Sequence, residues 1–145
     1  MERFRIATCL LPLLLFACGE EGLRSTPEAT VENAIDLMRE RNVETCAQLF
    51  LTEDFLWGNK DRDASVKEIK RYLKEVESFT VQVSDLETEE TSDSAATFQL
   101  SAIVGMKLSK KSEFFGLPFD AVPLKVEGQL RFTDDGWRIA SFMLK

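Results

Sequence analysis

Residues 26–50 read TPEATVENAIDLMRERNVETCAQLF, and the spacing of their apolar side chains decides the fold class. Apolar residues recur every three or four positions, which is typical of one face of a helix. The first stripe is Val31, Ala34, Ile35 and Met38, and the second is Val43, Cys46, Ala47 and Phe50. Ser25 or Thr26 can cap the first helix, and Glu28 has the capping-box spacing to Ser25. This stretch predicts two consecutive amphipathic helices.

A third helix is predicted further along the chain. Ser65 and Glu68 repeat the capping-box spacing. The apolar positions that follow at helical spacing are Val66, Ile69, Leu73 and Val76. The connection before this helix, EDFLWGNKDRD at residues 53–63, is rich in turn formers and predicts a short strand at Phe55 to Trp57.

From Phe79 onwards the apolar period changes to two, which indicates strands with one buried face. Alternating apolar residues predict three strands, along Phe79, Val81 and Val83, along Phe98, Leu100, Ala102, Val104 and Met106, and along Val122, Leu124, Val126, Leu130 and Phe132. A fourth strand, Trp137 to Leu144, follows the hairpin signal DDG at residues 134–136. Three helices followed by about four antiparallel strands predict an α+β domain with the helices on one face of a curved sheet.

The helix pair at residues 26–50 and the terminal strand opening DDGWRI resemble the cone-shaped superfamily of nuclear transport factor two and ketosteroid isomerase. The resemblance covers nearly all of residues 26–145 and is closest to small bacterial lipoproteins of that fold, whose activities are mostly unassigned. It implies a pocket between the sheet and the helices. A shared fold does not by itself establish a function.

The N-terminal 18 residues predict export. Two arginines precede an apolar run from Ile6 to Ala17 that is interrupted by Pro12 and is too short to span a bilayer. Residues 15–18, LFAC, resemble the bacterial lipoprotein signal, although Phe16 is bulkier than that signal usually has. The resemblance implies that Cys18 becomes the first mature residue and carries acyl chains such as palmitate. The alternative is an ordinary secretory cleavage site.

These features divide the chain into a signal peptide (1–17), a lipidated tether (18–25) and one α+β domain (26–145). The predicted location is the bacterial cell envelope, anchored to the membrane through Cys18. Gly19 stands where an Asp commonly retains such lipoproteins at the inner membrane, so the outer membrane is expected if the source has two. The net charge of -7 argues against nucleic acid as a partner.

Candidate catalytic groups are few. The chain contains no His, which excludes His-based dyads, triads and metal sites. After loss of Cys9 and lipidation of Cys18, Cys46 is the one thiol left, so no disulfide or Cys-based metal site is expected. Cys46 is interpreted as a core residue. Neither a metal nor a cofactor is predicted.

Two classes of function follow. The favoured one is a non-catalytic domain that binds a small apolar ligand or another envelope protein, because the strand rows predicted to face the pocket contain no carboxylate. The predicted pocket residues are Tyr72, Phe98, Leu100 and Val126. The alternative is an isomerase- or dehydratase-like enzyme that uses Asp54, Tyr72 or Asp120, with both Asp residues in loops near the pocket mouth.

An aromatic loop lies between the second and third strand rows. Its sequence KKSEFFGLPFD, residues 110–120, contains Phe114, Phe115 and Phe119. The favoured interpretation is that the loop folds back and closes the open end of the cone. The alternative is an interaction site for lipid, a partner protein or a ligand entrance, which an exposed apolar cluster often marks.

Overall fold

The computed structural model describes residues 22–108 and 121–145. The predicted lipidation site Cys18, the aromatic loop residues Phe114, Phe115 and Phe119, and the candidate acid Asp120 lie outside these ranges. The elements are α2 (Pro27–Arg39), α3 (Val43–Phe50), β1 (Leu51–Trp57), β2 (Lys60–Asp61), α4 (Arg62–Lys74), β3 (Val76–Ser92), β4 (Ala95–Leu108), β5 (Ala121–Thr133) and β6 (Gly136–Leu144). Within the described ranges no helix is long and apolar enough to cross a bilayer.

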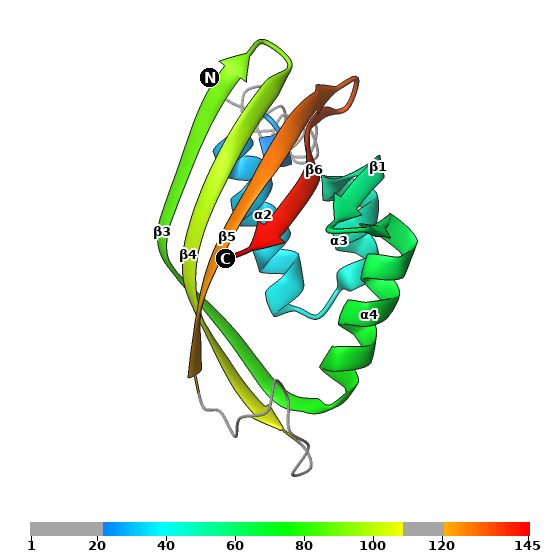
Figure 1. Cartoon of the computed structure of the whole chain (residues 1–145), viewed down its shortest axis with the longest axis vertical. Helices are drawn as coiled ribbons and strands as arrows, with labels where there is room; N and C mark the ends of the chain where they lie inside the picture. Colours follow the sequence, from blue (N-terminus) through cyan, green and yellow to red (C-terminus); the bar gives the residue numbers. More distant parts are fainter. Residues whose placement is uncertain (1–21, 109–120) are drawn as a thin grey trace, which may run out of the picture.

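The predicted class, three helices on one face of a curved sheet, is confirmed (Figure 1). The sheet has six strands in the order β2-β1-β6-β5-β4-β3, so the prediction of about four strands is wrong. The prediction of a purely antiparallel sheet is also wrong, because β1 runs parallel to β6. The register of that pair shifts between Leu51 and Leu56. This irregularity puts two exposed residues, Glu53 and Asp54, side by side and removes the alternation that marks a strand.

The helix starts differ in part from the predicted caps. Thr26 caps α2, since its hydroxyl oxygen accepts from the Ala29 amide at 3.1 Å. Ser25 is not the cap and donates to the Gly22 carbonyl instead. Asp61, not Ser65, caps α4 by accepting from the Ala64 amide at 2.8 Å. Ser65 lies within α4, and its buried side chain donates to the Asp61 carbonyl.

The longest feature of the sheet is the bent hairpin of β3 and β4 (Figure 1). It pairs continuously from Val76 opposite Leu108 to Ser92 opposite Ala95, with three register shifts. Val76, predicted as the end of the third helix, is the first residue of β3. The outer half of β3 is mostly exposed and polar, with Leu86 as its apolar contact to the core, so its strand structure depends mainly on hydrogen bonds to β4.

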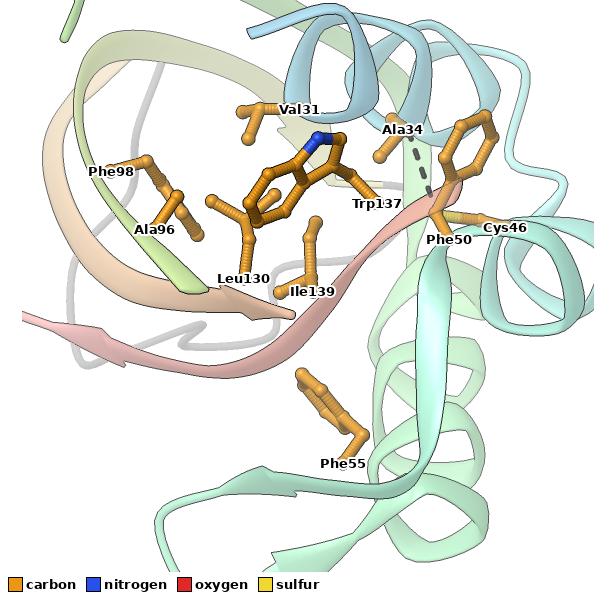
Figure 2. Packing of buried hydrophobic residues seen from close by; sticks show 10 residues of the cluster. All are labelled: Val31, Ala34, Cys46, Phe50, Phe55, Ala96, Phe98, Leu130, Trp137 and Ile139. Carbon is orange, nitrogen blue, oxygen red and sulfur yellow. Dashed lines mark hydrogen bonds between the residues drawn. The ribbon is translucent and has the colours of Figure 1, made fainter. Parts of the chain in front are cut away.

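The hydrophobic core fills the space between the concave face of the sheet and the helices. Phe50, Phe55 and Leu130 are completely enclosed. Figure 2 shows Trp137 and Ile139 of β6 beside Leu130 of β5, under Val31 of α2. The core therefore joins the N-terminal helices to the last two strands of the chain.

The described chain already contacts the domain before α2 begins. Arg24 is only 7% exposed, and its guanidinium donates to the carbonyl oxygens of Asp135 and Leu49, both at 3.0 Å. The Trp137 amide donates to the Arg24 carbonyl at 3.0 Å. Gly136 lies directly beneath this segment with a φ of 109°, and a Cβ there would stand 2.8 Å from the Arg24 carbonyl oxygen. Arg24, which falls in the range predicted as tether, is thus fixed to the β5–β6 turn and the end of α3.

Candidate functional site

A cavity of ≈ 190 Å³ lies between the helices and the sheet. All three helices and four of the six strands contribute to its wall. The helical lining residues are Val31, Ala34, Ile35, Met38, Val43, Cys46, Ala47, Ser65, Val66 and Ile69, and the strand residues are Leu51, Phe55, Phe98, Leu100, Val126, Ile139 and Phe142.

The wall of this cavity offers almost no polar chemistry. Ser65 is the one hydroxyl among the described lining residues, and it donates to the Asp61 carbonyl at 2.7 Å. The Cys46 thiol donates to the Ala34 carbonyl at 3.6 Å, shown as the dashed line in Figure 2. Both polar side chains are therefore used within the protein, and the described lining contains no carboxylate or amine.

Burial raises the pKa of the Cys46 thiol to about 12. A thiol needs to ionise before it becomes a good nucleophile. At neutral pH the Cys46 side chain is a protonated, weakly polar part of the wall. The interpretation of Cys46 as a core residue is consistent with its place in the cluster of buried side chains.

This raised pKa predicts a loss of stability in alkali. The unfolded chain releases the Cys46 proton near its ordinary pKa of 9.0, while the folded protein keeps it until about pH 12. Between these values deprotonation of Cys46 stabilises the unfolded state relative to the folded state. The contribution of the protonated Cys46 thiol to stability is therefore complete below pH 9 and falls as the pH rises toward 12. Urea unfolding of wild type and Cys46→Ala at pH 8 and pH 11 measures it. We expect wild type to lose more stability than the variant, and parallel losses would contradict the prediction.

The structure places the predicted pocket residues in two different environments. Phe98 and Leu100 of β4 and Val126 of β5 line the cavity, and Leu100 and Val126 are cross-strand partners. Tyr72 of α4 does not line it. Its hydroxyl bonds to a carboxylate oxygen of Glu68 at 2.8 Å, and the Arg71 guanidinium lies 5.1 Å from its ring centre.

Asp54 lies outside the cavity as well. It belongs to β1 and not to a loop, and Arg131 of β5 binds both of its carboxylate oxygens at 3.0 Å. The pKa of the Asp54 carboxyl is below its usual range, first because of the Thr52 hydroxyl and next because of Arg131. The buried Thr52 oxygen makes no contact with ordinary hydrogen-bond geometry, so we regard Arg131 as the main partner. This pair borders a separate charged hollow of ≈ 510 Å³ on the surface.

The candidate catalytic groups therefore do not converge. Asp54 borders the charged hollow, Tyr72 lines neither that hollow nor the cavity, and Asp120 lies outside the described residues. The described residues also contain no group of three acidic or cysteine side chains that could hold a metal ion. The cavity is suited to enclosing an apolar molecule and has no acid or base in its described wall.

Several cavity residues were not singled out from the sequence. Phe55 and Phe142 come from β1 and β6, the parallel pair that the sequence did not predict, and their ring centres are 5.5 Å apart. Both residues are aromatic positions in predicted strands, which was the available signal. Gly128 of β5 is a second omission. A Cβ there would stand 2.4 Å from the Phe98 ring, so the missing side chain lets that ring lie against the sheet.

Phe98 and Phe142 also border a second hollow, of ≈ 490 Å³, at the surface between β1, β4, β5 and β6. Gly128 lies between them in the sheet and pairs with both. Phe98 and Phe142 thus belong to the walls of both the inner cavity and this outer hollow.

Comparison with known proteins identifies the fold. No protein-family model and no curated protein matches the chain. A protein from Novosphingobium aromaticivorans provisionally named a scytalone dehydratase matches with a TM-score of 0.69 and 16% identity over 81% of this chain and 79% of its own. An NTF2-like protein of unknown function from Pseudomonas putida has a TM-score of 0.64 and 9% identity, covering 81% and 82%.

A third solved structure is a provisionally named dehydratase of the NTF2-like family from Streptomyces avermitilis. It has a TM-score of 0.60 and 17% identity, covering 82% of this chain and 97% of its own. At these identities the likeness establishes the fold alone. The domain has the fold of nuclear transport factor two-like (NTF2-like) proteins, as its resemblance predicted.

Proposed function

We propose that this protein is a lipid-anchored protein of the bacterial cell envelope whose NTF2-like domain binds a small apolar ligand without catalysis. The observation that carries the binding proposal is the apolar cavity between the helices and the sheet. The one hydroxyl and the one thiol of its described lining are already hydrogen-bonded within the protein. Acid–base chemistry needs a titratable group within hydrogen-bond reach of the substrate. The one titratable group of the described wall is the Cys46 thiol, which stays protonated at neutral pH.

The alternative proposal, an isomerase- or dehydratase-like enzyme, is favoured by one observation. Two of the structural neighbours carry provisional dehydratase names. The positions of Asp54 and Tyr72 count against it, since each is engaged with charged partners outside the cavity. Another envelope protein as the bound partner would depend on the aromatic loop, which lies outside the described residues.

The anchor proposal is supported by LFAC at residues 15–18 and by the short apolar run before it. One acyl chain gives only marginal membrane binding, whereas two or more make it stable. In a source with two membranes we propose the outer membrane, because Gly19 follows Cys18.

We expect Cys18→Ala to abolish acylation, because the change removes the thiol that accepts the lipid. Mass spectrometry of the protein purified from its native membrane measures this directly. Wild type should begin at Cys18, carry the mass of its acyl chains and release a small apolar molecule on denaturation.

Cys46→Ala is the matched control for this experiment, since it removes the other thiol of the mature chain and should keep the acyl mass. Acyl chains that persist in Cys18→Ala would show that the attachment site is wrong. Recovery of wild type mainly in the inner-membrane fraction would contradict the outer-membrane proposal.

A further inference from the structure

We infer that the ligand is an uncharged, hydrocarbon-like molecule about the size of one ring, and that a hydroxyl or carboxylate on it weakens binding. This inference rests on the proposed ligand-binding function and specifies its chemistry. Three properties of the described wall carry it: the volume of the cavity, the engagement of its polar atoms and the absence of a counter-charge.

The volume sets the size of the ligand. The cavity measures ≈ 190 Å³. An engineered apolar cavity of about 150 Å³ in another protein stays dry and accepts benzene. A single ring with a small substituent therefore fits the described wall, whereas a fused polycyclic molecule needs the wall to move.

The polar atoms of the wall limit which groups the ligand can carry. The Ser65 hydroxyl and the Cys46 thiol have only one proton each to donate, and each proton is directed at a backbone carbonyl. Ser65 belongs to the first half of α4 and is only 1% exposed. The carbonyl that accepts its proton belongs to Asp61, the residue that caps this helix. A ligand hydroxyl would lose its hydrogen bonds to water on entering, would find no free donor in this wall, and could itself donate only to the oxygen of Ser65 or the sulfur of Cys46.

Charge is excluded more strongly than hydroxyl groups. Cys46 is the one titratable side chain of the described lining, and it is protonated at neutral pH. Ion pairs such as Arg131 with Asp54 lie on the outside of the domain. A buried carboxylate without a partner is strongly disfavoured. Three phenyl rings, Phe55, Phe98 and Phe142, instead offer flat apolar surfaces to an aromatic ring.

The test uses the whole protein with its anchor, in lipid nanodiscs, and three probes of one ring each: toluene, phenol and benzoate. The readouts are thermal unfolding of the domain and the rate at which a thiol reagent modifies Cys46, whose side chain lines the cavity. We expect toluene to slow the modification about tenfold, phenol to bind roughly tenfold more weakly than toluene, and benzoate to have no effect.

Matched variants locate the binding. Ala47→Leu fills the cavity from α3 and should abolish the effect of toluene, whereas Ala64→Leu on the exposed side of α4 should leave it unchanged. Val126→Ile, which adds one methylene to the wall, should weaken toluene binding and replaces Ala47→Leu if that variant does not fold.

Each outcome decides one point. Toluene protection that both filling variants leave intact would show that the ligand binds elsewhere. Phenol or benzoate binding as tightly as toluene would overturn the inferred chemistry while leaving the binding function standing. Wild type that responds to none of the probes and carries no molecule from its native membrane would overturn both.

Discussion

Phe55→Ala is expected to lower the free energy of unfolding by about 3–5 kcal/mol, the range for truncating a large aromatic residue in a core. Phe55 is 0% exposed and lies where β1 faces the helices. Its ring packs at 5.5 Å from the Phe142 ring, which in turn stacks on Trp57 at 5.3 Å. The truncation leaves a void next to an existing cavity. Few neighbouring side chains are therefore in a position to move in and fill the void. Chemical denaturation monitored by fluorescence measures the change.

The neighbouring residue provides the control. Leu56 is 49% exposed on the other side of the same strand, and Leu56→Ala should change stability by no more than about 0.5 kcal/mol. Equal losses for the two variants would mean that the faces of β1 are assigned wrongly. That result would also remove Phe55 from the wall of the cavity.

Gly128→Ala is expected to cost about 3 kcal/mol, the upper end of the usual range for overpacking. The added Cβ would stand 2.4 Å from Cε1 of Phe98 and 2.5 Å from the Ser141 carbonyl oxygen. The Phe98 ring is part of the buried core, and the Ser141 carbonyl belongs to the β6 backbone. Thermal or chemical unfolding of the variant measures the cost.

A double substitution separates the two clashes. In a Phe98→Ala background, Gly128→Ala should cost less, because the ring is gone, but it should still cost something, because the Ser141 oxygen remains. A wild-type unfolding curve for Gly128→Ala alone would show that Phe98 moves freely. Phe98 would then not be a fixed part of the wall of the cavity or of the surface hollow.

The helices were predictable because their signals are local. The stripes of α2 and α3 and the presence of Pro27 in the first turn need no knowledge of distant residues. The sequence predicts the start of α4 four residues late, because both Asp61 and Ser65 are possible caps. Only the packing, which buries Ser65, decides between them.

β1 and β3 are longer than the sequence predicts, because their additional residues depend on partners far along the chain. β1 is held by β6, whose first residue is about eighty positions away, and a register shift hides the period of two. The outer half of β3 is rich in Ser, Glu and Thr, residues that predict a loop when viewed alone. Both segments become strands because a neighbouring strand satisfies their backbone hydrogen bonds.

The candidate site was predictable to the same extent. Phe98, Leu100 and Val126 stand on alternating rows whose inward direction follows from the pattern. Tyr72 follows Ile69 at helical spacing and could equally have faced inward. Its direction is set by Glu68 one turn earlier, which offers a carboxylate on the outer face. The direction of the Tyr72 side chain therefore depends on its contacts in the folded protein and not on the spacing of apolar residues along α4.

The fixed position of Arg24 bears on how the domain would be oriented at a membrane. With Leu23 and Arg24 packed on the domain, only four residues separate Cys18 from Leu23, a reach of roughly 18 Å when fully extended. A lipid on Cys18 would then tether the domain to the membrane at the end that contains the β5–β6 turn. So short a tether would restrict rotation of the domain and keep this end nearest the lipid headgroups. The hollow bordered by Arg62, Arg138 and Asp135 lies at the same end, so its charged side chains would be on the surface that faces the bilayer.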